Sequence, residues 1–182
     1  MAKIHKFSPS QYKEKSIHNV CRETFNSHEN PVKSLELKLG KEVIYLILDN
    51  SKDAVVTEES ANTLTYKQGE TVKVFTRVCY EYRREHSKGR IMSEEDALDK
   101  FLDQTGIYPV EGSELHISKV KHFEKFSQQK KDSGFRNCFE INGEFIVQDA
   151  ELFNKALARG VGTRGSYGFG LLLTEELLKE VS

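Results

Sequence analysis

Histidine and cysteine are the residues of this chain best suited to proton transfer, nucleophilic attack or metal binding, because their pKa values lie nearest to neutral pH. The chain has six histidines: His5, His18, His28, His86, His116 and His122. It has three widely spaced cysteines: Cys21, Cys79 and Cys138. No CxxC pair occurs and the histidines do not follow the spacing of a zinc site. The sequence therefore predicts no metal, no cofactor and three reduced thiols, and it leaves the choice among the histidines open.

One of these histidines shares a predicted helix face with other polar side chains. The pattern predicts a helix from about Ser10 to about Ser27, with Pro9 in its first turn and Ser8 as the N-cap. At about 100° per residue, one face carries three residues within about 60° and a fourth beside them: Lys15, His18 and Arg22, with Tyr12 adjacent. This stripe could hold a phosphate. For a lone histidine, a solvated helix face is the alternative.

A glycine-rich segment near the C-terminus is the most informative stretch. Five glycines lie within eleven residues, directly after a predicted helix and before an apolar run: Gly160, Gly162, Gly165, Gly168 and Gly170. Glycine lets the backbone approach a ligand, and Arg164 adds a charge that suits phosphate. A nucleotide-cofactor loop has the reverse order, strand before and helix after, so the sequence argues against one. Tight packing of the loop on a sheet is an equally good interpretation, and both can hold.

Basic side chains gather in two further segments although the net charge is −1. The first cluster comprises Arg83, Arg84, Lys88 and Arg90, and the second comprises Lys130, Lys131 and Arg136. Acidic residues gather elsewhere, at 94–96 and at 175–176. This separation predicts one face able to bind phosphates, with merely solvated surfaces as the alternative.

The elements that would position these residues alternate between strands and helices. Strands are predicted at 3–7, 35–39, 43–48, 71–82, 115–126 and 169–173. The segment 135–147 is predicted to be a hairpin that turns at Asn142-Gly143, and residues 49–69 a loop with a short helix near Ser60. Ser93 and Asp149 are predicted to cap two further helices, which end at Gly106 and Gly160.

This order predicts an α+β fold of two tandem ferredoxin-like βαββαβ domains, at residues 1–68 and 69–182, each an antiparallel sheet with helices on one face. No apolar stretch is long enough to cross a bilayer, and together with the reduced thiols this predicts a cytoplasmic protein. A fold of this class hosts many functions and does not identify one.

The glycine-rich segment carries a resemblance to a known family. A predicted helix is followed by Gly160-Val161-Gly162, then by four residues, and then by Tyr167-Gly168-Phe169-Gly170-Leu171-Leu172. This pattern resembles the C-terminal signature of the repeat-associated (RAMP) superfamily of CRISPR proteins. More specifically, the chain resembles the crRNA-maturation endoribonucleases of Type I-E systems. Further matches lie at Gly69, 72–75, 88–90, 97–102 and 139–145, with Phe101 in place of a usual tryptophan. The resemblance extends from about Tyr66 to Leu173, and the first 65 residues agree in element order.

The resemblance implies a CRISPR repeat hairpin RNA as substrate and metal-independent cleavage at the base of its stem. The 2′-hydroxyl of the RNA attacks the phosphate, leaving a 2′,3′-cyclic phosphate and a 5′-hydroxyl. It also implies that the protein stays on the mature guide RNA as a subunit of a Type I-E surveillance complex. The basic and glycine-rich residues named above would then bind RNA.

The resemblance selects His18 among the histidines, because the family has its catalytic histidine in the first helix. Where the family has a tyrosine three residues earlier, this chain has Lys15, and Tyr12 lies one turn further back. Lys15 and Tyr12 are therefore the other candidate catalytic residues. The alternatives are a non-catalytic RNA-binding subunit of such a complex and an unrelated ferredoxin-like protein–protein module.

Overall fold

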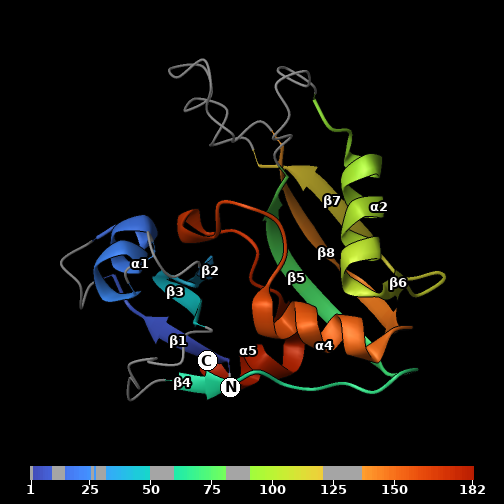
Figure 1. Ribbon diagram of the computed structural model, residues 1–182, viewed down its shortest axis with the longest axis horizontal. Coiled ribbons are helices and arrows are strands. Elements are labelled where there is room, and N and C mark those ends of the chain that lie inside the picture. The colour runs from blue at the N-terminus through green and yellow to red at the C-terminus, as the bar shows by residue number, and fades with distance from the viewer. Residues whose placement is uncertain are drawn as a thin grey trace.

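The computed structural model of the chain contains two β-sheets (Figure 1). It describes residues 2–9, 15–25, 27, 32–49, 60–80, 91–120 and 137–182. Within these ranges, no helix is both long and apolar enough to cross a membrane.

The first sheet is built from the N-terminal part of the chain. It contains β1 (Lys3–Phe7), β2 (Lys33–Leu39), β3 (Glu42–Asp49) and β4 (Ser60–Asn62), in the order β2-β3-β1-β4 with every neighbour antiparallel. Helix α1 (Ile17–Phe25) connects β1 to β2, and its apolar side packs on Phe7 and Ile47 of the sheet. Strand β3 therefore lies between two strands that the helix connects, as in a ferredoxin-like fold.

The second sheet repeats this strand order. It contains β5 (Thr71–Cys79), β6 (Ile107–Pro109), β7 (Leu115–Lys119), β8 (Cys138–Val147) and β9 (Leu173–Thr174), in the order β6-β8-β5-β9, with β7 also paired to β8. Helices α2 (Glu94–Thr105) and α4 (Ala150–Arg159) pack on one face of it, over a core that includes Phe101, Phe145 and Phe153. The predicted α+β class with two ferredoxin-like sheets is thus confirmed.

The predicted caps of the two later helices are confirmed. The Ser93 side chain accepts a hydrogen bond from the backbone N–H of Asp96, 3.0 Å away, and Gly106 ends α2 in the left-handed conformation. Asp149 accepts from the N–H of Leu152, 2.9 Å away, at the start of α4. These contacts are local, which is why the sequence alone predicts them.

The prediction for the start of α1 is wrong. The helix begins at Ile17, and both Lys15 and Ser16 precede it, so Ser8 is not its cap. The Ser16 hydroxyl lies 3.3 Å from the backbone N–H of Asn19 and takes the capping position instead. Residues 10–14 lie outside the described part of the chain, so the position of Tyr12 remains a prediction.

The predicted hairpin at Asn142-Gly143 is also wrong, because β8 runs unbroken from Cys138 to Val147. Gly143 pairs with Val74 of β5 on one side and with Leu115 of β7 on the other. A Cβ atom at Gly143 would lie 2.8 Å from Leu115 Cδ1. The glycine is therefore a close-packing position within a central strand, and long pairing on both sides overrides the local turn preference.

Two further predictions differ from the structure. Residues around Ser60 form β4 rather than a helix, and the last strand is only Leu173–Thr174. A helix absent from the predictions, α5 (Glu175–Val181), follows it, with the Thr174 hydroxyl accepting a hydrogen bond from Leu177 N–H. Apolar residues on both sides of β9 pack across the two halves instead: Leu171 before it and Leu177 of α5 share a core with Ile4 and Leu46 of the first sheet. The division at residues 68 and 69 stays a prediction.

His5 generates a prediction about stability. Its side chain is buried under α1, with its ring 5.1 Å from that of Phe25, and burial lowers its pKa despite the opposing charge of Asp49. Below about pH 6.5 the unfolded chain takes up a proton that the folded chain resists. We therefore expect the free energy of unfolding to fall on acidification, with a contribution of at most about 1.4 kcal/mol per pH unit from this residue.

Denaturant unfolding of His5→Phe between pH 7.5 and 5 checks this expectation, because a phenyl ring keeps the aromatic packing and removes the titration. The variant should lose part of the pH dependence that the unmodified chain shows. His116→Ala, at an exposed position on β7, should keep it. If the free energy of unfolding has the same slope against pH in the unmodified chain and in His5→Phe, His5 is not a source of the pH dependence.

Candidate active site

His18 faces the glycine-rich segment, which comes from the other end of the chain. Its Nδ1 lies 3.2 Å from the Ser166 hydroxyl, across 148 residues of sequence. Its ring stacks on that of Tyr167, with centroids 4.0 Å apart and planes inclined by 7°. Ser166 and Tyr167 belong to a short 3-10 helix, η3 (Gly165–Tyr167), which lies beside α1 (Figure 1). One hydrogen-bonding contact and one stacking contact thus fix the orientation of a half-buried imidazole.

The first sheet holds one side of the glycine-rich segment. Ser34 of β2 donates a hydrogen bond from its buried hydroxyl to the Gly165 carbonyl and accepts one from Gly168 N–H at 3.0 Å. A Cβ atom at Gly165 would lie 1.8 Å from the Val32 carbonyl oxygen, so no larger residue fits this contact. Because β2 is an edge strand of its sheet, this segment also covers an edge that would otherwise expose backbone polar groups.

The second sheet holds the other side. The carbonyl of Cys79, at the end of β5, accepts hydrogen bonds from Thr163 N–H at 2.9 Å and from the Thr163 hydroxyl at 3.1 Å. Gly170 N–H donates to the Arg77 carbonyl at 2.7 Å. Arg77 adds a direct link between the sheets, because its guanidinium donates to the Glu36 carbonyl of β2 at 3.1 Å. The segment that contacts His18 is therefore fixed to both sheets.

Most of the backbone donors of this segment are already used inside the protein. The N–H groups of six of its residues donate to protein acceptors: Gly160, Val161, Thr163, Tyr167, Gly168 and Gly170. A phosphate would therefore meet side chains here more readily than a row of open N–H groups. The contacts of the glycines favour the packing interpretation, and their predicted role in RNA binding stays a prediction.

The predicted catalytic and basic residues are only partly brought together. Lys15 precedes α1, so the helical geometry groups only His18 with Arg22, which is exposed. The Lys15 ammonium forms an ion pair with Glu23, and its carbonyl accepts a hydrogen bond from the Tyr45 hydroxyl at 3.0 Å. The half-buried Arg164 directly precedes η3, in the left-handed conformation with φ 58°. Eight other predicted residues lie outside the described part: Tyr12, Arg83, Arg84, Lys88, Arg90, Lys130, Lys131 and Arg136.

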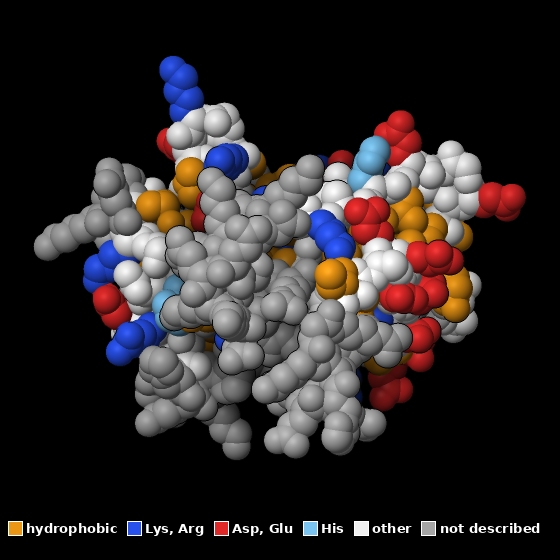
Figure 2. Space-filling model, turned by 90° about the horizontal axis from the view of Figure 1, so that it is seen from above, with side chains coloured by type: hydrophobic (Ala, Val, Ile, Leu, Met, Phe, Trp, Pro, Cys, Tyr) orange, Lys and Arg blue, Asp and Glu red, His pale blue; other side chains and the backbone are white. Residues whose placement is uncertain are grey.

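Except for Glu23, which pairs with Lys15, acidic side chains gather away from α1 (Figure 2). Figure 2 shows Asp and Glu gathered on the right-hand side of the molecule, the side of α2 in Figure 1. The first turn of α2 has three exposed carboxylates, Glu94, Glu95 and Asp96. The predicted basic clusters, at 83–90 and 130–136, lie outside the described part of the chain, so the predicted separation of charge stays a prediction.

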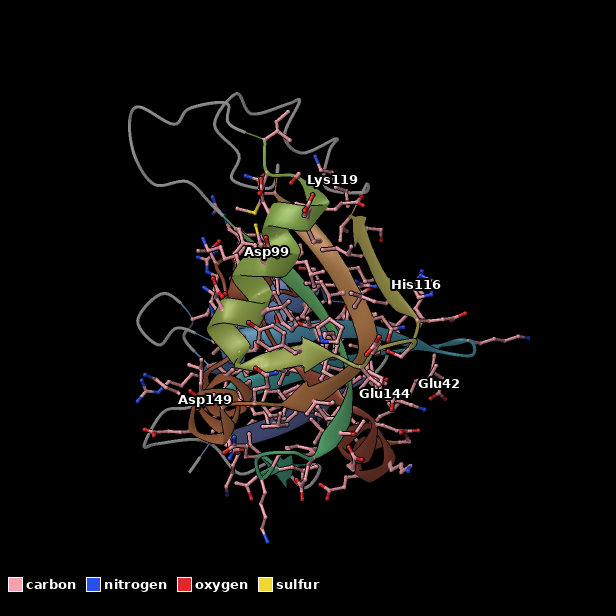
Figure 3. All side chains as sticks on the ribbon, turned by 90° about the vertical axis from the view of Figure 1, so that its right-hand side faces the viewer. Glu42, Asp99, His116, Lys119, Glu144 and Asp149 are labelled. Carbon is pink, nitrogen blue, oxygen red and sulfur yellow. The ribbon has the colours of Figure 1, made fainter. Side chains whose placement is uncertain are left out.

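The other described histidines are placed differently. His5 is in the core under α1, and His116 projects outward from β7, 3.7 Å from Glu114 (Figure 3). Ser166 and Tyr167 were absent from the predicted site although they lie inside the segment that the sequence singled out. Their pairing with His18 spans the whole chain, and no local spacing signals it.

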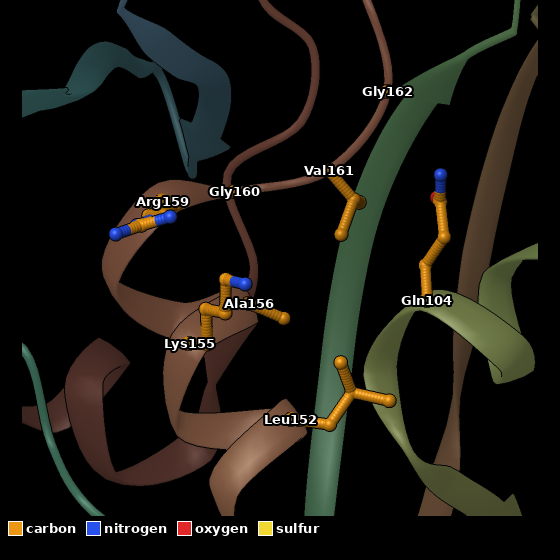
Figure 4. A pocket seen from close by; sticks show the side chains of 8 residues that line it. All are labelled: Gln104, Leu152, Lys155, Ala156, Arg159, Gly160, Val161 and Gly162. Carbon is orange, nitrogen blue, oxygen red and sulfur yellow. The ribbon is translucent and has the colours of Figure 1, made fainter.

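A pocket of about 220 Å³ lies between α2, α4 and the start of the glycine-rich segment (Figure 4). Its lining includes Lys155, Arg159 and Gln104 but neither Ser166 nor Tyr167. It is therefore separate from the contacts of His18.

The fold of the chain is that of several solved structures. The CRISPR endoribonuclease Cse3 bound to a 19-nucleotide RNA superposes with a TM-score of 0.65 at 15% identity, over 96% of this chain and 99% of that one. Thermus thermophilus Cse3, bound to an RNA representing a pre-cleavage complex, gives 0.63 at 15% identity, over 95% and 98%. A chain of a CRISPR RNA-guided surveillance complex gives 0.57 at 13% identity, over 94% and 98%.

Curated protein sequences include no match to this chain. A family model described as "CRISPR associated protein" matches residues 8–175, from the coil after β1 to the first residue of α5. This match includes α1 with His18 and the whole glycine-rich segment. The chain therefore belongs to the family of CRISPR-associated proteins.

Proposed function

We propose that this protein is a metal-independent endoribonuclease that binds a CRISPR repeat hairpin and cleaves the precursor transcript at the base of the stem. The observation that carries the proposal is the orientation of His18 by Ser166 and Tyr167. A histidine on a merely solvated helix face is not expected to have a hydrogen-bonding contact and a stacked ring from a segment distant in sequence. One structural neighbour is described as an endoribonuclease bound to RNA and another as bound to an RNA representing a pre-cleavage complex, and both support the same function.

The chemistry needs three things that side chains can supply without a metal. A base removes the proton from the attacking 2′-hydroxyl, an acid protonates the leaving 5′-oxygen, and a cation stabilises the phosphorane between them. His18 takes one of the proton-transfer roles. Arg164 and Arg22 supply positive charge from the glycine-rich segment and from α1. The products are a 2′,3′-cyclic phosphate and a 5′-hydroxyl.

Lys15 contributes to this scheme when the RNA phosphate replaces Glu23 as the partner of its ammonium group. In the structure its ammonium is paired with the Glu23 carboxylate, and both side chains are partly exposed. Exposed ion pairs contribute little, about 0–1 kcal/mol, so a phosphate can replace Glu23 at small cost. Lys15 then adds to the charge that stabilises the phosphorane. Tyr12 completes the proposed catalytic group.

The mature guide RNA stays bound, and the protein then serves as a subunit of an RNA-guided surveillance complex. The similarity to a chain of such a complex supports this. The two basic clusters at 83–90 and 130–136, together with the glycine-rich segment, would contact the RNA backbone. A second candidate function is a non-catalytic RNA-binding subunit. The pairing of Lys15 with Glu23 favours it, because that pairing neutralises the nearest cation preceding α1.

The first test measures cleavage of the host's own repeat hairpin in EDTA. The RNA should be cut once at the stem base, and replacing the attacking 2′-hydroxyl by hydrogen should abolish the cut. In His18→Ala the single-turnover rate should fall by about 10²–10⁴-fold, the usual contribution of an acid–base group. The Kd for the hairpin should change by no more than a few-fold, because phosphate contacts dominate affinity.

His116→Ala is the matched control, since it removes an imidazole from an exposed strand position. It should cleave like the unmodified protein. If His18→Ala cleaves at the original rate, the proposed active site is wrong. Tight binding of an uncut hairpin by the unmodified protein would instead favour the non-catalytic function.

A second prediction concerns the two residues that orient His18. Tyr167→Leu removes the stacked ring, and Ser166→Ala removes the hydroxyl near Nδ1. Each should lower the single-turnover rate by about tenfold, the cost of losing about 1.4 kcal/mol of orientation in the transition state. Hairpin affinity should stay within a few-fold. Tyr167→Phe keeps the ring and should retain the rate. A Tyr167→Phe variant as slow as Tyr167→Leu would contradict a stacking role.

A third prediction concerns how the glycine-rich segment fits on β2. Gly165→Ala places a methyl group against the Val32 carbonyl, and the segment or the strand must move. We expect a loss of about 1–3 kcal/mol of stability, as for other overpacked sites, and slower cleavage. Gly40→Ala is the control: it lies in the β2–β3 turn at φ 64° with no atom within 4 Å of the added methyl. It should lose stability through backbone strain and still cleave normally.

A further inference from the structure

Two cysteines that the proposed mechanism does not use lie side by side beneath the glycine-rich segment. Cys79 ends β5 and Cys138 begins β8, and the two residues are directly paired across the strands. Their sulfur atoms are 3.2 Å apart. The distance is within the range of a thiol hydrogen bond.

The backbone at this pair is suited to a disulfide. In the adjacent pair, Tyr80 N–H donates to the Asn137 carbonyl at 2.9 Å. Since hydrogen-bonded and non-hydrogen-bonded pairs alternate in an antiparallel ladder, Cys79 and Cys138 occupy a non-hydrogen-bonded pair. The Cα atoms of such a pair are typically about 4.5 Å apart, inside the range of about 4.4–6.8 Å that disulfides span. The two strands need not separate or slip for the bond to form.

The same pair supports the segment that orients His18. Both side chains are buried, with exposed fractions of 0% and 2%, and they pack against Phe169 and Tyr167. The Cys79 carbonyl accepts both hydrogen bonds from Thr163. A Cβ atom at Gly162 would lie 2.7 Å from that carbonyl oxygen, so the segment rests directly on this strand end. A change at the sulfur atoms therefore acts on the packing of the ring that stacks on His18.

We propose that Cys79 and Cys138 are an oxidation site, which a hydroperoxide converts into a reversible disulfide that shifts the glycine-rich segment. One thiolate attacks the peroxide, the O–O bond breaks, and a sulfenic acid and one water or alcohol form. The second thiol then attacks the sulfenic sulfur, and the S–S bond forms as water leaves. Together the two thiols lose two electrons and two protons, and hydrogen peroxide is reduced to two waters. A dithiol reductant reverses the reaction by thiol–disulfide exchange.

The third cysteine is a built-in control. Cys21 lies in a different cluster, under α1 with Phe7 and Val20. Burial raises the pKa of this thiol to about 12, and neither of the other two cysteines belongs to its cluster, so it has no thiol partner for a disulfide. Oxidation should therefore leave one thiol for each chain.

Forming the bond brings the sulfur atoms from 3.2 Å to about 2.05 Å, a movement of about 1 Å beneath Tyr167 and Phe169. A misplacement of this size near a catalytic group costs up to about 10²-fold in rate. We expect oxidised protein to cleave repeat hairpin RNA at least about tenfold more slowly. This consequence rests on the proposed function, whereas the disulfide itself does not.

The experiment treats the Cys21→Ala variant with hydrogen peroxide and follows the thiols and the mass. Two thiols should disappear together, with a mass loss of two hydrogens, and dithiothreitol should restore both. Cys21→Ala/Cys138→Ala should form no intramolecular disulfide. Persistence of both thiols, or sulfinic acid without a disulfide, would overturn the proposal, whether or not the protein cleaves RNA.

The coupling to the segment has two readouts. Tyrosine fluorescence and proteolysis between 160 and 170 should change on oxidation of Cys21→Ala and return on reduction, independently of any activity. The cleavage rate should fall and recover in parallel. A disulfide that forms without altering either the segment or the rate would contradict the coupling. An altered segment in a protein that never cleaves RNA would retain the oxidation site and reject the ribonuclease function.

Discussion

Close packing of the segment 160–170 between the two sheets is the constraint on which the rest of the structure depends. On one side, Ser34 of β2 binds the backbone at both Gly165 and Gly168. On the other, Arg77 and Cys79 of β5 accept hydrogen bonds from Gly170 and Thr163. Each sheet has a complete ferredoxin-like strand order of its own. What joins them into one site is a segment whose glycines let backbone contact backbone.

This packing distinguishes between the two interpretations of the glycines, which are phosphate binding and tight packing of the segment on a sheet. A phosphate cradle needs backbone N–H groups that face an open site, whereas most of the donors in this segment already bind protein acceptors. Val32 leaves no room for a side chain at Gly165. The residues between the glycines, Ser166 and Tyr167, are the ones that reach His18. The glycines thus allow the segment to pack closely between the sheets. The side chains that this packing positions are the ones that can take part in the chemistry.

How far sequence predicts the molecule follows from the range of each interaction. The caps at Ser93 and Asp149 depend on a backbone N–H three residues ahead, so the sequence contains all that is needed. The same local reasoning fails at Asn142-Gly143, where pairing with strands distant in sequence keeps β8 extended. The contact of His18 with Ser166 lies beyond local reasoning altogether. The resemblance to a family selected His18, but neither propensity nor periodicity could supply its two contacts.

The position of His18 has a consequence for the order in which a site can form. Helix α1 belongs to the first sheet by its packing on Phe7 and Ile47, yet its histidine is oriented by the C-terminal segment. Neither half of the chain therefore contains the oriented imidazole by itself. Leu171 and Leu177 pack into the core of the first sheet and bring that segment to α1 through burial of apolar surface. Hydrophobic packing at the C-terminus is thus a precondition of the proposed catalysis, because it brings Ser166 and Tyr167 to a histidine that α1 alone would leave solvated.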